Sequence, residues 1–186
     1  MSLERCDLFK KKTGSEIMKR STFLAGLLAS SFLTACSGRD TKFRGYNGPQ
    51  VTRIVLYKGR RKLRLLHNND VLRSYRVRLG FAPVGHKQVE GDGRTPEGHY
   101  QIDRKNPNSR FHLSVGISYP NRADRSAAAA LGASAGGDIF IHGAPRRGST
   151  ADGSTDWTWG CIAVSNREIE EIYSMVNVGT PITIYP

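Results

Sequence analysis

A thiol and an imidazole stand at the ends of two short apolar runs in the C-terminal part of the chain. Residues 139–141 are apolar and lead into His142, and a second apolar run, residues 161–164, opens with Cys161. Such runs predict two strands with the imidazole and the thiol at facing ends. The thiolate is the reactive form of cysteine, and a nearby imidazole can take its proton or stabilise it as an ion pair. The pattern predicts a nucleophile, Cys161, with His142 as its general base and acid.

The glycine before the thiol has a predicted role of its own. Because Gly160 lacks a side chain, its backbone can come close to a substrate carbonyl, so the amides of Gly160 and Cys161 are the expected oxyanion hole. Loss of one such donor typically slows acyl transfer about 10²–10³-fold. The alternative for Cys161 is a buried, inert thiol at the start of a strand.

Aromatic, hydroxyl and basic side chains near the thiol and the imidazole are candidates for substrate binding. Trp157, Thr158 and Trp159 come just before the glycine, and the two indoles could form a substrate wall or pack in the core. Arg146 and Arg147 follow the imidazole and could hold a substrate carboxylate by a forked contact. An exposed loop face is the alternative for this arginine pair.

The remaining histidines give weaker signals. His86 lies in a polar loop and could orient substrate or simply face solvent. His99, His112, His142 and Cys161 are residue types that bind zinc, but their spacing matches no zinc pattern. We therefore expect no metal and no other cofactor.

The N-terminal residues have the features of an export signal. Two basic residues at 19–20 precede an apolar run at 23–33, which is shorter than the about 20 apolar residues that a transmembrane helix needs. The sequence Leu-Thr-Ala-Cys that ends at Cys36 resembles a bacterial lipobox. We expect translation to start at Met18, residues 1–35 to be an upstream extension and signal segment, and residues 36–50 to be a tether lipidated at Cys36. An ordinary cleaved signal or a buried N-terminal helix is the alternative.

Export also constrains the other cysteines and the location. Cys6 would be lost and Cys36 acylated, which leaves Cys161 as the free thiol of the folded part. A disulfide between Cys36 and Cys161 is the alternative. Because Ser37 rather than Asp follows the lipobox cysteine, we expect an exported, periplasm-facing lipoprotein of the outer membrane of a Gram-negative bacterium.

The chain is strongly basic. Its formal net charge is +12, and residues 1–35 hold six basic and three acidic side chains, which leaves +9 for the remainder. Nucleic acid, anionic lipid headgroups and acidic wall polymer are the partners that such a charge favours, and export makes nucleic acid the least expected. Alternation with apolar residues also indicates a solvated strand face for the basic residues Arg53, Arg60, Arg61, Lys62, Arg64, Arg73, Arg76 and Arg78.

Residues 51–186 read as one catalytic domain that is mainly β with minor α. Three β-rich runs with tight turns between them predict an antiparallel meander, and three further strands follow, the last of them compatible with a sheet edge. The polar segment 80–98 is too long for a hairpin, and such loops are commonly functional. Besides the two short runs at 139–141 and 161–164, the expected strands are residues 51–57, 63–66, 75–79, 98–103, 111–119 and 181–185.

Two helices are predicted from their caps. Asn121 can cap a short helix over residues 127–131, with Asp124 in its first turn. Ser165, with Glu168 three residues later, forms a capping box that opens a second, amphipathic helix.

Three separated motifs resemble the YkuD-type L,D-transpeptidase catalytic domain. They are Thr95-Pro96-Glu97-Gly98, then His142-Gly143 followed by Thr158-Trp159-Gly160-Cys161, and finally Gly179-Thr180-Pro181-Ile182-Thr183-Ile184. The stretch Trp-Gly-Cys-Ile-Ala-Val-Ser-Asn, with Gly91-Asp92-Gly93-Arg94 upstream, is most similar to the YafK-like branch. Two departures stand out, because most members have His where this chain has Trp159, and an Arg soon after the thiol where it has Ile162-Ala163-Val164.

The resemblance implies a fold and a reaction. The implied fold is a mixed β-sandwich capped by short helices, with a backbone carbonyl near Gly143 orienting His142. The implied activity is cysteine acyl transfer on peptidoglycan stem peptides at meso-diaminopimelate, either as an L,D-transpeptidase or as a hydrolase that trims peptides or releases a wall-linked lipoprotein. The alternative is a non-catalytic peptidoglycan-binding lipoprotein.

Overall fold

The structure is a computed structural model that describes residues 41–145 and 156–186. The predicted signal, the predicted lipidation site Cys36, and Arg146 and Arg147 lie outside the described residues. Neither helix within these two ranges combines the length and the apolar character needed to cross a bilayer.

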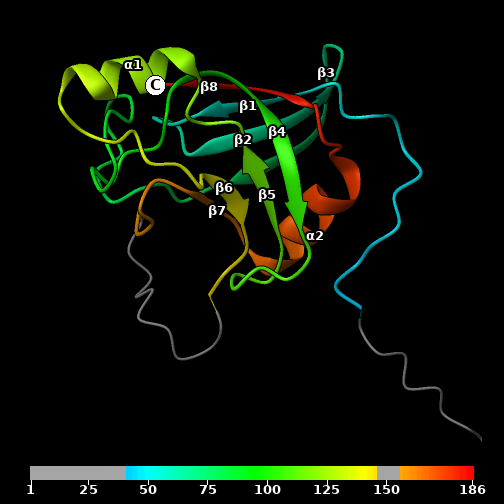
Figure 1. Cartoon of the computed structure of the whole chain (residues 1–186). Coiled ribbons are helices and arrows are strands. Elements are labelled where there is room, and N and C mark those ends of the chain that lie inside the picture. The colour runs from blue at the N-terminus through cyan, green and yellow to red at the C-terminus, as the bar shows by residue number, and fades with distance from the viewer. Residues whose placement is uncertain (1–40, 146–155) are drawn as a thin grey trace, which may run out of the picture. The chain divides into compact units, whose positions relative to one another are not determined.

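Eight strands of the described residues form one curled, mixed sheet, with two short helices beside it (Figure 1). The order in the sheet is β3-β2-β1-β8-β4-β5-β6-β7, with β1/β8 and β6/β7 parallel and the other pairs antiparallel. This confirms the mainly β prediction with minor α. The elements are β1 Arg53–Tyr57, β2 Lys62–His67, β3 Asp70–Arg76, β4 Gly98–Asn106, β5 Ser114–Ile117, α1 Arg122–Ala130, β6 Phe140–His142, β7 Ile162–Ala163, α2 Asn166–Met175 and β8 Pro181–Tyr185.

The predicted meander is confirmed, but its third strand begins earlier than expected. Strands β1, β2 and β3 pair in antiparallel fashion, and β3 ends at Arg76. The chain then makes two isolated bridges, Arg78 with Ala163 and Gly80 with Thr158. These bridges join the segment after β3, at one end of the sheet, to the segment around β7, at the other end. The curled sheet is therefore closed along one seam.

The last strand corrects a prediction. Strand β8 was expected to suit a sheet edge, but it lies in the middle of the sheet, parallel to β1 and antiparallel to β4. Pro181 is its first residue, where a missing N–H is tolerated even in a central strand. Burial of Ile182 and Ile184 in the core holds the strand in this place.

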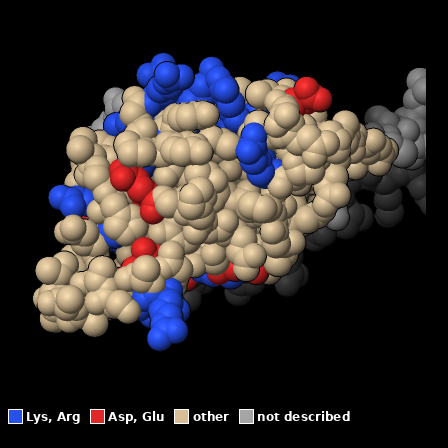
Figure 2. Space-filling view, turned by 90° about the horizontal axis from the view of Figure 1, so that it is seen from above, with Lys and Arg blue, Asp and Glu red and all other residues tan. Residues whose placement is uncertain are grey.

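The basic residues of the meander alternate with core residues, as expected for a solvated strand face. Arg53 and Arg76 are exposed, while Leu63, next to half-buried Lys62 and Arg64, is fully buried. On the face drawn in Figure 2, Lys and Arg side chains form a group along the upper margin, while most of the surface is uncharged. The alternation leaves cations on the outside of the curled sheet.

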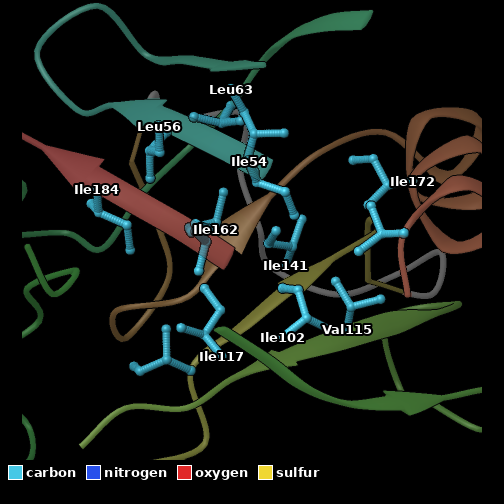
Figure 3. Packing of buried hydrophobic residues seen from close by; sticks show 14 of the residues in the cluster. Ile54, Leu56, Leu63, Ile102, Val115, Ile117, Ile141, Ile162, Ile172 and Ile184 are labelled. Atoms are coloured by element: carbon cyan, nitrogen blue, oxygen red, sulfur yellow. The ribbon is translucent and has the colours of Figure 1, made fainter. Parts of the chain in front are cut away.

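The inside of the curl is filled by aliphatic side chains (Figure 3). One residue in two along each strand points inward, because successive side chains of a strand alternate between its faces. Burial of each such side chain contributes about 1.5–3 kcal/mol. Helix α2 adds Ile172 to this cluster, whose labelled members include Ile54, Leu56, Leu63, Ile102, Val115, Ile117, Ile141, Ile162 and Ile184.

Both predicted helix caps are confirmed. Asn121 accepts from the Asp124 amide and Ser165 accepts from the Glu168 amide, and each acidic side chain returns a bond to its cap residue. Helix α1 begins at Arg122, earlier than the predicted 127, because its capping box forms directly after Pro120. Helix α2 buries Ile169, Ile172 and Met175, and so is anchored much more firmly than α1, whose buried positions are one alanine and one aspartate.

A buried lysine holds the long loop between β3 and β4. Lys58, only 1% exposed, donates to the carbonyls of Gly85 and Thr95 at 2.6 and 2.8 Å and to the carboxylate of Glu97 at 2.8 Å. Burial lowers the pKa of Lys58, and the contact with Glu97 opposes that effect. Asp92 organises the tip of the loop by accepting from Lys87 and from three backbone amides. The loop is thus structured by specific bonds.

Candidate active site

The pairing of β6 with β7 determines on which face of the sheet the thiol and the imidazole lie. Ile141 lies opposite Ile162, and His142 lies opposite Ala163. Both isoleucines are fully buried in the core. Because side chains alternate along a strand, the neighbours of these isoleucines, including His142 and Cys161, project from the opposite, outer face of the sheet. The expectation that two strand ends bring these groups together is met by the backbone.

The two groups line one pocket. A cavity of about 470 Å³ opens beside β6 and contains His142, Cys161 and Asp138 in its wall. Ser114, opposite His142 in the next strand, is also in the wall. The other lining residues are Asn106, Asn108, Ser109, Arg110, Phe111 and Phe140. The polar side chains of the loop after β4 therefore face the two reactive groups.

The imidazole is held from three sides. Its Nδ1 lies 2.7 Å from the carbonyl oxygen of Gly143, a bond in which Nδ1–H donates and Nε2 is left as the acceptor. The ring centroid lies 4.5 Å from that of Phe111 and 5.7 Å, edge-on, from that of Trp157. Burial lowers the pKa of His142, and the bond to Gly143 opposes this. The ring is therefore neutral near pH 7 and ready to accept a proton.

The thiol is half-buried beside the start of β6. Cys161 Sγ lies 3.4 Å from the carbonyl oxygen of Asp138. Burial raises the pKa of the thiol and the nearby Asp138 charge adds to the rise, while a backbone hydrogen bond at Phe140 and the Lys87 charge partly oppose it. In the free protein the pair is thus a thiol and a neutral imidazole, because burial disfavours the charged form of each group.

The turn before the thiol is locked by a hydroxyl. Thr158 Oγ1 donates to the Cys161 carbonyl at 2.6 Å and accepts from the Gly160 amide at 3.2 Å. Gly160 has φ +122°, and a Cβ placed there would lie 2.6 Å from the Arg94 carbonyl oxygen. Both the positive φ and the lack of space for a Cβ therefore require glycine at position 160.

Two predicted roles around this turn change. Thr158 is 3% exposed, so it shapes the turn and is not a substrate contact. The Gly160 amide, predicted to form the oxyanion hole, is already bonded to the Thr158 hydroxyl in this structure. The oxyanion-hole role of the Cys161 amide stays a prediction.

Gly143 is a close-packed glycine. Its amide donates to the carbonyls of Phe111 and Leu113, and a Cβ placed there would lie 2.5 Å from Oδ1 of Asn166. The same Oδ1 accepts from the Ala144 amide at 2.9 Å. The first residue of α2 therefore pins the chain that supplies the carbonyl facing His142.

The predicted aromatic wall divides into two environments. Trp157 contacts the rings of Phe111 and His142 and is half-buried. Trp159 is 71% exposed and rests edge-on against Phe81, with ring centroids 5.1 Å apart. Trp157 supports the imidazole, and Trp159 offers its ring to solvent at the other end of the turn.

His86 does not line the pocket. Its Nδ1 accepts from the Glu97 amide at 3.0 Å, and its Nε2 lies 3.3 Å from Asp124 Oδ1. It thereby ties the long loop to the first turn of α1. The sequence suggested a substrate contact because a polar loop gives no indication of which element it packs against.

Sequence reasoning missed an arginine that pairs with Asp138, the residue whose carbonyl faces the thiol. Arg104, Gly116 and Phe140 lie in one row across β4, β5 and β6, next to the segment that holds Cys161. The guanidinium sits 4.5 Å above the Phe140 ring and contacts the carboxylates of Asp103 and Asp138 at 2.7 and 2.8 Å. It thereby holds Asp138, which has φ +54° and whose carbonyl faces the thiol. Only the cross-strand register reveals this row, so no local sequence signal could have found it.

These features define a class of protein in which a thiol and an oriented imidazole share one outer face of a curled sheet. The chain belongs to the YkuD family, the L,D-transpeptidase catalytic domain, whose model matches residues 51–184. The resemblance stated from the motifs is thereby confirmed.

Individual relatives agree with this assignment. The chain is 30% identical over 175 aligned residues to YafK of Escherichia coli K12, which carries a provisional L,D-transpeptidase name, and the match covers 87% of this chain and 64% of YafK. The helical cell shape determining protein Pgp2 of Campylobacter jejuni is 28% identical, with a TM-score of 0.58 over 79% of this chain and 51% of Pgp2. Bd1075 of Bdellovibrio bacteriovorus shares the fold, with a TM-score of 0.53 at 24% identity over 73% of this chain and 48% of Bd1075. The chain thus spans from about half to just under two thirds of these relatives.

Replacing Gly160 with alanine should disable the turn. We expect Gly160→Ala to lower the free energy of unfolding by about 1–3 kcal/mol, because a side chain at this φ is strained, and to slow alkylation of Cys161. Gly91→Ala is the matched control, since Gly91 has φ +82° but open space around its Cβ position. For both variants, urea denaturation measures the free energy of unfolding and iodoacetamide kinetics measure the rate of Cys161 alkylation. Equal effects of the two substitutions would mean that the contact with Arg94 is unimportant.

The pH dependence of alkylation should report the burial of the thiol. In a Cys6→Ser/Cys36→Ser background, we expect the rate of Cys161 alkylation to rise with pH and its midpoint to lie above the ordinary thiol value of about 8.5. The reason is that burial disfavours the thiolate, so its fraction is small at pH 7 and grows only at higher pH. A midpoint below pH 7 would show that the resting pair is instead a thiolate and an imidazolium.

Proposed function

We propose that this protein is a cysteine acyl-transfer enzyme that acts on peptidoglycan stem peptides at meso-diaminopimelate. The observation that carries the proposal is the placement of Cys161 and a Gly143-oriented His142 in one pocket. Family membership supports the reaction class, and the cell-shape role named for Pgp2 supports the cell wall as the place of action.

The proposed reaction has two stages. In the first, His142 Nε2 takes the Cys161 proton, the sulfur bonds to the scissile carbonyl carbon, and the C–N bond breaks as the imidazolium returns the proton to the leaving amine. In the second, an amine or a water attacks the thioester and the cysteine thiol is regenerated. An amine gives transpeptidation, and water gives amidase or carboxypeptidase action, including release of a wall-linked lipoprotein. The Cys161 amide stabilises the oxyanion in both stages.

The surroundings of the pair suggest how a peptide is held. Asn106, Asn108 and Ser109 bring amide and hydroxyl groups to the pocket wall. These are adaptable donors and acceptors for a peptide backbone. Trp159 adds an exposed ring on the far side of the turn, and we propose that Arg146 and Arg147 contact a substrate carboxylate.

Replacement of the nucleophile tests the proposal. We expect the full chain to change the muropeptide composition of purified sacculi, and Cys161→Ala to lower the rate by at least about 10³-fold. New cross-links at diaminopimelate, trimmed peptides or released lipoprotein, identified by mass spectrometry, would each name a different outcome of the second stage. His142→Gln should give a comparable loss while keeping the thiol.

The same experiment tests the rival function. A non-catalytic wall-binding lipoprotein would bind sacculi equally well with or without Cys161 and would leave every muropeptide unchanged. It would also form no adduct with a carbapenem on Cys161. Sacculus binding without products or adduct would therefore reject the enzyme in favour of a binding protein.

We further propose that the mature protein is an exported lipoprotein anchored through Cys36, with residues 36–50 as its tether. The lipobox and the preceding apolar run support this. We expect mass spectrometry of membrane-extracted protein to find an N-terminal, acyl-modified Cys36, and Cys36→Ser to remain unprocessed and unacylated. Recovery of an unmodified mature form in the soluble periplasmic fraction would show an ordinary cleaved signal instead.

A further inference from the structure

A second recessed surface lies on the other side of the strand that follows Cys161. One hollow, of about 530 Å³, is lined by Arg60, Arg61, Lys62, Ser74, Tyr75 and Arg76. A neighbouring hollow, of about 420 Å³, is lined by Arg76, Val77, Arg78, Ala163, Val164, Ser165 and Glu168. The two meet at Arg76, and we call them together the basic groove. The first hollow lies beside the paired ends of β2 and β3, and the second lies at the seam where the sheet closes.

The basic groove leads to the candidate active site. Arg78 forms a bridge with Ala163, and Ala163 lies opposite His142 in the parallel pair. Residues paired across strands share a face of the sheet, so Arg78, Ala163 and His142 form one row on the outer face. At a strand spacing of 4.7–4.9 Å, the Cα atoms of Arg78 and His142 are roughly 10 Å apart. The pocket of Cys161 and the basic groove thus flank strand β7.

The charges of the basic groove are mostly uncompensated. Among the residues that the structure describes, Arg60, Lys62, Arg76 and Arg78 take part in no ion pair, and Arg61 alone pairs, with Asp156. The acidic residue in the lining, Glu168, is already bonded to the amide and hydroxyl of Ser165. Four cations of the lining therefore have no anionic partner among the described residues, and one of them, Arg60, lies over the Tyr57 ring at 5.7 Å. Cations of like charge are held together there without an internal partner.

We propose that the basic groove binds a carboxylate-bearing peptide chain of the wall polymer and presents it to the thioester at Cys161. This rests on the proposed function, and it deepens that function by assigning a second substrate site. A two-stage acyl transfer needs room for a second chain, and the groove supplies it across β7 from the first pocket. Guanidinium groups suit carboxylates, because their planar donors match both oxygens of the anion.

The shape favours a chain over a flat anionic membrane. The cations line a recess along a seam, and Val77, the aliphatic residue between Arg76 and Arg78, is buried. A surface that docks on lipid would instead present apolar side chains that enter the headgroup region. A recess lined by cations along its length suits an extended peptide that carries several carboxylates.

The test compares two triple variants of the full chain with the same loss of charge. The groove variant is Arg60→Gln/Arg76→Gln/Arg78→Gln, and the control is Arg53→Gln/Arg122→Gln/Arg125→Gln, whose residues are also exposed but lie elsewhere. Each is measured for binding to purified sacculi and to phosphatidylglycerol vesicles at low and high salt. Alkylation of Cys161 by iodoacetamide and formation of new muropeptides are followed in parallel.

We expect the groove variant to bind sacculi about tenfold more weakly than wild type at low salt, and the control less than about twofold. The difference should shrink at high salt, and Cys161 alkylation should stay unchanged in both. Equal losses in the two variants, or no loss in the groove variant, would overturn the proposal. Loss of vesicle binding with normal sacculus binding would overturn it in favour of a membrane surface.

Failure of the proposed function gives a different pattern. In that case the wild type binds sacculi without changing any muropeptide. The difference in sacculus binding between the groove variant and the control variant still shows whether the groove binds the wall polymer. If wild type makes products and the groove variant makes them at the same rate from the same sacculi, the enzyme stands and the groove proposal fails. If cross-linked products fall in the groove variant while hydrolytic products persist, the groove holds the amine-bearing second chain.

Discussion

The parallel register of β6 and β7 is the constraint on which the candidate site depends. Ile141 and Ile162 lie opposite each other in the core, so the residues beside them must project outward. A slip of either strand by one residue would turn His142 or Cys161 toward the aliphatic core and an isoleucine toward the pocket. The core would then lose the packing of that isoleucine and take in a polar side chain in its place. Aliphatic packing thus keeps the reactive pair in register without any direct bond between thiol and imidazole.

The same packing determines the charge state of the pair. Burial raises the pKa of Cys161 and lowers that of His142, so the desolvated surroundings favour the neutral form of both. A resting thiolate would need a compensating cation, and the cations near this segment are already paired, Arg104 with Asp103 and Asp138 and Lys87 with Asp92. In the proposed reaction, charge then develops only when a substrate carbonyl is attacked and the proton moves to His142. The bond from Nδ1–H to the Gly143 carbonyl stabilises the imidazolium at that moment.

Local signals in the sequence predicted much of this arrangement. The caps of both helices, the antiparallel meander and the thiol and imidazole at strand ends depend on residues close together in the chain, and the structure contains them all. Strand β8 was misjudged because its terminal Pro181 resembles an edge signal, whereas its central place comes from burial between β1 and β4. Thr158, His86 and Arg104 were misread or missed for one reason. Their roles depend on which distant backbone groups and side chains the fold brings next to them.

Trp159 differs from its two neighbours in the turn before Cys161, because they are constrained by the structure and it is exposed. Thr158 is buried and bonded at both ends of the turn, and Gly160 has no room for a side chain, so neither can vary without disturbing the thiol. Trp159 alone in this turn projects into solvent, supported from one side by Phe81. In the family pattern this position commonly carries a histidine. An indole cannot carry a proton, so in the proposed reaction the proton transfer falls to His142 alone, and the exposed ring of Trp159 is an apolar surface at the rim that suits contact with a ring or an aliphatic chain.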